Sequence, residues 1–161
     1  MSKAKTKVYF AGPLFTQAEW QWNAAVAASL RRLGFDVILP QEREQALRQS
    51  GATVDAATLF ADNLAGIERS QVVVAVLDGA DPDSGTCWEA GYAYKAGRLV
   101  IGLRTDLRAG GDADPETPVN LMLSRSCAKI VLIPPTQRVD VSEVGRSVAE
   151  AITACLEARR P

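Results

Sequence analysis

The feature that most constrains the fold is the segment Val72–Leu77, in which every residue is apolar. A half-exposed strand alternates apolar and polar residues, whereas a strand buried on both faces of a parallel sheet is apolar throughout. Four other short apolar runs occur along the chain, and they are bounded by turn residues or by helix-like patterns. These runs are Val8–Ala11, Asp36–Leu39, Leu99–Leu103 and Ile130–Ile133.

Segments with helical periodicity lie between these runs, so strands and helices alternate along the chain. Gly34 follows the first such segment, where a glycine commonly ends a helix. The polar stretch from Gln41 to Val54 shows no clear period, and we assign it no element. The predicted helices are Gln17–Leu33, Asp55–Arg69, Asp83 to about Ala96, Asn120–Ser124 and Val141–Ala158.

This alternation predicts an α/β fold in which residues 1–161 form a single domain. We expect a flavodoxin-like, five-stranded parallel sheet of order 2-1-3-4-5 with helices on both faces. In such sheets, ligands bind beyond the carboxyl ends of the strands. The segments that follow strands one, three and four are therefore the candidate site: Gly12–Phe15, Asp78–Glu89 and Arg104–Arg108.

The absence of histidine narrows the chemistry, because it excludes a Ser-His-Asp triad, a Cys-His pair and a His-ligated metal. The three cysteines form no CxxC pair, so we predict no metal site and no cofactor. The formal net charge of −1, with no basic face, does not favour nucleic-acid binding. The polar N-terminus and the lack of a run of about 18 apolar residues indicate no membrane partner, and we expect a cytoplasmic location.

The segment after the third strand carries four carboxylates at the expected ligand edge, and Asp83 and Glu89 are the most informative. If Asp83 lies in the loop and Glu89 in the first helical turn, both can face one cleft. A purely structural interpretation is equally open, with Thr86 as N-cap and Glu89 completing a capping box. Asp83 could then form an Asx-turn before Gly85.

Five short motifs stand out along the chain: Tyr9–Phe15, Leu77–Gly79, Asp83–Ala93, Arg104–Asp106 and Pro118–Met122. The third contains the pattern Asp-Ser-Gly-Thr-x-x-Glu-x-Gly-Tyr-Ala, which is the most specific of them. Together these motifs resemble the nucleoside 2-deoxyribosyltransferase family, over most of the chain from about Lys7 to Ile133.

The resemblance implies a role for each matching residue. Glu89 matches the nucleophile that attacks the anomeric carbon, and Tyr9 matches the tyrosine that holds this nucleophile. Asp83 matches the carboxylate that binds the sugar hydroxyls. Asn120 and Met122 match residues donated by a neighbouring subunit, which implies a homo-oligomer, at least a dimer, with shared sites.

The family also uses an aspartate before the third strand to protonate the leaving base. Here Asn63 stands at the matching position, and Asp62 is beside it. We therefore predict Asp62 as the proton donor, although one residue along a helix turns a side chain by about 100°. The candidate catalytic residues are Glu89, Asp62 and Tyr9, and the candidate substrate-binding residues are Gly12, Phe15, Asn63, Asp83, Gly85, Asn120 and Met122.

The predicted function is transfer of a 2-deoxyribosyl group between nucleobases through a covalent glutamyl intermediate. A carboxylate near the anomeric carbon suits an oxocarbenium-like transition state. Asp83 favours nucleosides, because its charge would repel a 5′-phosphate. Arg104 and Arg108 could favour a phosphate, but we interpret them as a solvated loop paired with Asp106. Two alternatives stay open: an N-glycosidase of nucleosides or their 5′-monophosphates, and a binding module without turnover.

Overall fold

The computed structural model describes residues 4–51, 54–107, 117–133 and 140–159. Its centre is a parallel five-stranded sheet of order β2-β1-β3-β4-β5, as the alternation of strands and helices predicts. The strands are β1 (Lys7–Ala11), β2 (Asp36–Ile38), β3 (Val72–Val76), β4 (Leu99–Arg104) and β5 (Lys129–Leu132).

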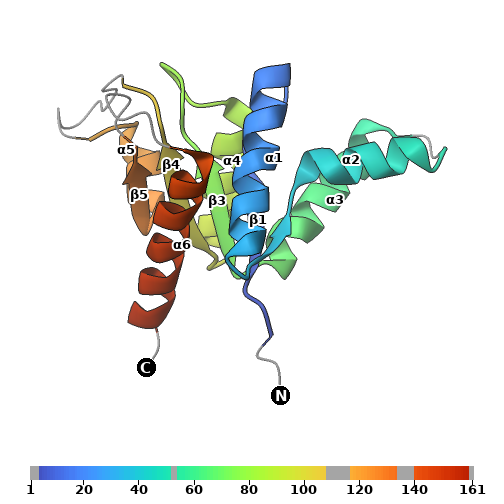
Figure 1. Cartoon of the computed structure of the whole chain (residues 1–161). Helices are drawn as coiled ribbons and strands as arrows, with labels where there is room; N and C mark the ends of the chain where they lie inside the picture. Colours follow the sequence, from blue (N-terminus) through green and yellow to red (C-terminus); the bar gives the residue numbers. More distant parts are fainter. Residues whose placement is uncertain (1–3, 52–53, 108–116, 134–139, 160–161) are drawn as a thin grey trace.

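The helices connect these strands and lie on both faces of the sheet (Figure 1). The polar stretch from Gln41 to Val54, for which the sequence predicts no element, contains most of a helix. This helix begins at Pro40, a position at which the N–H that proline lacks would have no partner within the helix. The helices are α1 (Gln17–Arg32), α2 (Pro40–Gln49), α3 (Ala56–Arg69), α4 (Ser84–Lys95), α5 (Leu121–Ser126) and α6 (Val141–Ala158).

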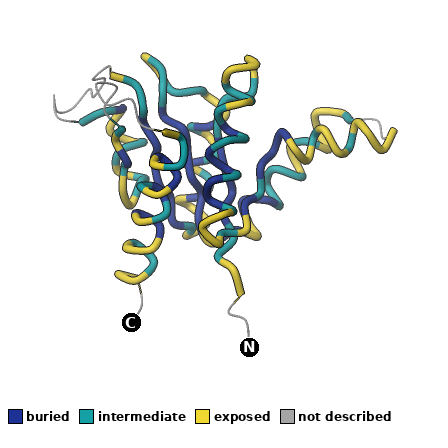
Figure 2. The backbone as a smooth tube through the Cα atoms, in the orientation of Figure 1, coloured by how far each residue is buried: buried dark blue, intermediate teal, exposed yellow. Residues whose placement is uncertain are grey.

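Strand β3 is buried at every position, which explains its uninterrupted apolar sequence. Its alternate side chains enter two cores. Val74 packs in the core beneath α1 and α6, whereas Val73 packs in the core beneath α3 and α4. Figure 2 shows the central strands buried and α2 largely exposed, while Figure 1 shows α2 and α3 extending to one side of the sheet.

The second core positions one residue of special interest, Tyr9 of β1, which is 1% exposed. Gly66 of α3 lies against its ring, and a Cβ at Gly66 would come within 2.9 Å of it. The glycine therefore lets α3 approach the sheet closely and holds the tyrosine ring flat beneath the helix. None of the described helices is both long and apolar enough to cross a membrane.

Candidate active site

Helix α4 begins where a carboxylate caps it. The Asp83 Oδ2 atom accepts hydrogen bonds from the Thr86 backbone N at 2.8 Å and from the Thr86 Oγ1 at 3.0 Å. Asp83 is therefore the N-cap, and the interpretation of Thr86 as N-cap with a Glu89 capping box is wrong. The aspartate satisfies a backbone N–H of the first turn that has no partner within the helix. The helix therefore starts at Ser84, three residues before the start that a Thr86 cap would give.

Because the helix starts at Ser84, Glu89 lies in its second turn and is free of capping. Its Oε1 atom accepts a hydrogen bond from the Tyr9 hydroxyl at 2.6 Å, between residues 80 positions apart in the chain. This short bond joins α4 to the central part of the sheet. It fixes the direction of the Glu89 carboxyl group from a strand, which is a rigid element.

The electrostatics of this pair are unusual for a glutamate. Burial raises the pKa of the Glu89 carboxyl to about 7, the Tyr9 hydrogen bond opposes this rise, and the negative charge of Asp83 adds to it. Burial and the nearby Glu89 raise the pKa of the Tyr9 hydroxyl, so Tyr9 stays a hydrogen-bond donor. A carboxyl group with a strongly shifted pKa in a cleft is often part of a functional site.

Glu89 lines a pocket of about 330 Å³ between α3 and α4, which we call the Glu89 pocket. Its walls are mostly apolar, with Asn63 as the other polar side chain among the described residues that line it. The lining residues are Phe60, Asn63, Leu64, Ile67, Gly85, Trp88 and Glu89.

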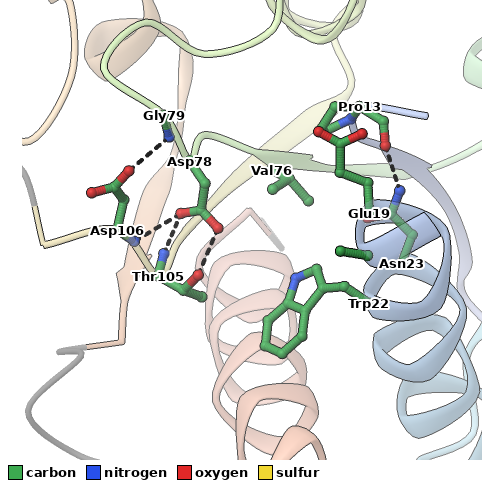
Figure 3. A pocket seen from close by; sticks show the side chains of 10 residues that line it. Pro13, Glu19, Trp22, Asn23, Val76, Asp78, Gly79, Thr105 and Asp106 are labelled. Carbon is green, nitrogen blue, oxygen red and sulfur yellow. Dashed lines mark hydrogen bonds between the residues drawn. The ribbon is translucent and has the colours of Figure 1, made fainter. Parts of the chain in front are cut away.

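A second pocket, of about 410 Å³, lies at the carboxyl ends of the strands near α1 (Figure 3). Asp78 there accepts hydrogen bonds from the Thr105 N at 2.5 Å, the Thr105 Oγ1 at 2.6 Å and the Asp106 N at 2.9 Å. Asp106 in turn accepts from the Gly79 N at 3.0 Å. These carboxylates bind the two loops that follow β3 and β4 to each other.

Comparison with known proteins gives the family. The sequence model of nucleoside 2-deoxyribosyltransferase matches residues 8–122. The chain belongs to the nucleoside 2-deoxyribosyltransferase family. A search of curated proteins found no match.

Several solved structures share this fold. A conserved protein from Enterococcus faecalis V583 is 29% identical with a TM-score of 0.69, covering 92% of this chain and 99% of its own. A 2-deoxyribosyltransferase from Bacillus psychrosaccharolyticus is 23% identical with a TM-score of 0.66, covering 87% and 90%. A CMP N-glycosidase from Clostridium botulinum is 13% identical with a TM-score of 0.56, covering 92% and 99%.

Within this nucleoside 2-deoxyribosyltransferase fold, the structure separates the two candidates on α3. Asn63 lines the Glu89 pocket, whereas Asp62 pairs with Arg43 of α2 at 2.9 Å and is not among the described residues that line it. The predicted proton donor therefore faces a neighbouring helix. The reason is the turn of side-chain direction between adjacent helical residues.

Asn120 and Met122 line a different groove, of about 590 Å³, between α4 and α5. Asn120 caps α5, and its Oδ1 accepts from the Met122 N at 2.8 Å. Met122 is 75% exposed. Neither residue is among the described residues that line the Glu89 pocket of the same chain.

Two predicted substrate-binding residues in the loop after β1 lie elsewhere. Phe15 is 81% exposed and is not among the described residues that line the Glu89 pocket. Gly12 faces α1, because a Cβ there would lie 3.2 Å from both Asn23 and Val76. Gly85 does line the Glu89 pocket, as expected.

The interpretation of Arg104 as a solvated residue is wrong. Arg104 is 2% exposed, and its guanidinium donates to the carbonyl oxygens of Leu77 and Gly79. It is the last residue of β4, and the segment that directly follows β3 presents these carbonyl groups to the guanidinium. Arg108 lies outside the described residues.

Sequence reasoning missed two aromatic residues of the Glu89 pocket, Phe60 and Trp88. They are 54% and 51% exposed, and their ring centroids are 5.7 Å apart with the planes tilted by 54°. One signal could have found Phe60: it precedes Asn63 by three residues on α3, a spacing that places both on one helix face. Trp88 directly precedes Glu89 in the chain, and this adjacency gives no comparable signal.

Proposed function

We propose that this chain cleaves the N-glycosidic bond of 2′-deoxynucleosides and transfers the 2-deoxyribosyl group to a second nucleobase. The observation that carries the proposal is the hydrogen bond of 2.6 Å between the Tyr9 hydroxyl and Glu89, at the edge of a pocket of about 330 Å³. Membership of the nucleoside 2-deoxyribosyltransferase family supports the reaction class.

In the proposed mechanism, a Glu89 carboxylate oxygen attacks the anomeric carbon as the bond to the base breaks. The electron pair of that bond leaves with the base, and a glutamyl ester of deoxyribose forms. A second base then attacks the same carbon and releases Glu89. Two displacements at one carbon restore the original configuration. Tyr9 acts as a positioning residue, because its hydroxyl directs the carboxylate without touching the sugar.

Asp83 is proposed to bind the sugar. Its Oδ2 accepts from Thr86, and its charge adds to the rise in the pKa of Glu89. Asp83 is not among the described residues that line the Glu89 pocket, but it caps the helix that carries Glu89. A free sugar hydroxyl can donate to a carboxylate, whereas a 5′-phosphate would be repelled. We therefore propose nucleosides in preference to 5′-monophosphates.

Two copies of the chain are proposed to share each site. The exposed Met122 and the cap residue Asn120 line a groove beside α4, together with Tyr94, which is 60% exposed. Large exposed apolar side chains that gather on one surface are typical of an interface. A neighbour packed there would carry Asn120 and Met122 toward the sugar.

Asp62 stays a prediction as the proton donor. To protonate a base in the Glu89 pocket, its carboxyl would have to leave Arg43, whose Nε lies 2.9 Å away. An Asp62→Asn variant tests this role directly, because loss of base release with intact folding would require Asp62 as an acid.

A product assay tests the function. The protein is incubated with 2′-deoxyinosine, with and without free adenine, beside the Glu89→Ala variant. We expect new 2′-deoxyadenosine that depends on Glu89. Equal release of hypoxanthine with or without adenine would favour the alternative function, a hydrolase in which water is the acceptor. Absence of any Glu89-dependent product from purine or pyrimidine nucleosides and their 5′-monophosphates would leave a binding module without turnover.

A further inference from the structure

The Glu89 pocket contains the proposed nucleophile, but no second side chain that could protonate a leaving base is among its described lining residues. Among the described residues that line it, Glu89 is the only titratable side chain. Asn63 lines the same pocket, and its amide can donate a hydrogen bond but cannot give up a proton. A neutral nucleobase that leaves as an anion is a poor leaving group, and general acid catalysis of such a step is worth about 10²–10⁴-fold.

The walls of the pocket favour positive charge. Phe60 and Trp88 present partly exposed rings that contact each other, with centroids 5.7 Å apart. One face of the Trp88 ring is stacked on Tyr92 at 5.4 Å, which leaves the other face for a ligand. No basic side chain is among the described lining residues. The faces of aromatic rings attract cations, most strongly for tryptophan. Glu89 contributes a carboxylate to the same space, and the charge of Asp83 acts on it. A flat cationic ring fits this combination better than a neutral one.

We infer that the site prefers N-glycosides whose base already carries a positive charge, such as an N7-alkylated purine or a pyridinium base. The inference rests on the proposed function of Glu89. When the Glu89 oxygen bonds to the anomeric carbon, the electron pair of the N-glycosidic bond neutralises the ring, and the base leaves without a proton. Water then displaces Glu89 and loses a proton to the solvent, or a second base takes the sugar.

The charge of such a substrate also prepares the nucleophile. Burial and Asp83 raise the pKa of Glu89 to about 7, so at neutral pH part of the population carries a protonated, unreactive carboxyl. A cationic ring beside Glu89 favours the ionised form. Binding of the substrate and activation of the nucleophile are therefore coupled, which a neutral nucleoside would not achieve.

The test compares 7-methyl-2′-deoxyguanosine, whose methylated imidazole ring carries a positive charge, with 2′-deoxyguanosine at neutral pH, each corrected for breakdown without enzyme. We expect kcat/KM to be at least about 100-fold higher for the methylated nucleoside, since it needs no acid. Equal, Glu89-dependent values would overturn this inference and leave the proposed function intact. Absence of Glu89-dependent cleavage of either compound would overturn both.

Variants of the pocket sharpen the test. Asn63→Asp adds an acid and should raise kcat/KM for 2′-deoxyguanosine, whereas Asn63→Ala removes the amide without adding one and should not. Trp88→Leu should raise KM for the methylated nucleoside about fivefold more than for the neutral one. An Asp62→Asn variant that loses only the reaction of the neutral nucleoside would identify an acid in the wild type and overturn the inference.

Discussion

Two carboxylates at the same edge of the sheet differ in what surrounds them. Asp78, in the pocket of Figure 3, accepts three hydrogen bonds from Thr105 and Asp106. Glu89 accepts a hydrogen bond from Tyr9 inside an apolar pocket, and burial raises its pKa to about 7. The carboxylate that is saturated by donors holds two loops together, whereas the one placed among apolar groups keeps oxygen atoms available for a substrate.

The largest expected effect is on turnover. Glu89→Ala removes the proposed nucleophile, so deoxyribosyl transfer should fall by at least about 10³-fold. Product formation measured by chromatography checks this. Glu150→Ala is the matched control, because Glu150 is an exposed glutamate on α6, on the other face of the sheet. Activity that survives in Glu89→Ala would contradict the assignment of the nucleophile.

The next largest effect is on stability, and it tests whether Asp78 holds the two loops together. Asp78→Ala leaves two backbone N–H groups and a hydroxyl without their acceptor, which should lower the free energy of unfolding by about 2–4 kcal/mol. The corresponding fall in Tm is roughly 5–10 °C. Asp81→Ala, an exposed residue in the same segment, should leave Tm nearly unchanged. Similar Tm values for both variants would show that the loops do not depend on Asp78.

Tyr9→Phe removes the hydroxyl that donates to Glu89 and leaves the Glu89 carboxyl in place. The hydroxyl lowers the pKa of Glu89, so its removal should move the acidic limb of the kcat/KM profile to higher pH. The loss of one positioning hydrogen bond should reduce kcat about tenfold. A reduced rate with an unmoved pH profile would mean that the hydroxyl positions the carboxylate without lowering its pKa.

The smallest effect is the dependence of stability on pH. Folding raises the pKa of Glu89 from 4.5 to about 7, so the folded protein retains a proton that the unfolded chain releases. The free energy of unfolding should therefore fall as the pH rises through this window, by about 1 kcal/mol given partial exposure to water. Glu89→Gln should not show this fall. Parallel urea midpoints for the two proteins from acidic to neutral pH would contradict the pKa shift.

Much of the fold followed from local patterns. The amphipathic segment Val141–Ala158 forms α6 with the predicted bounds, and the apolar run from Val72 becomes the central strand β3. Pattern and period determine these elements, because the burial of a whole face dominates their energetics. The sequence placed the start of α4 at Asp83, one residue before the observed start, but it did not decide the cap, since Asp83 and Thr86 are both good N-cap residues and the choice between them depends on how the loop packs.

The sequence by itself predicted the order of the strands and, through its motifs, the family to which the chain belongs. Only the tertiary structure decided which side chains share the pocket. It brought Tyr9 within 2.6 Å of Glu89, turned Asn63 into the pocket and Asp62 toward Arg43, and buried Arg104. The physical reason is that residues on different elements meet through packing, and neither period nor spacing along the chain carries that geometry.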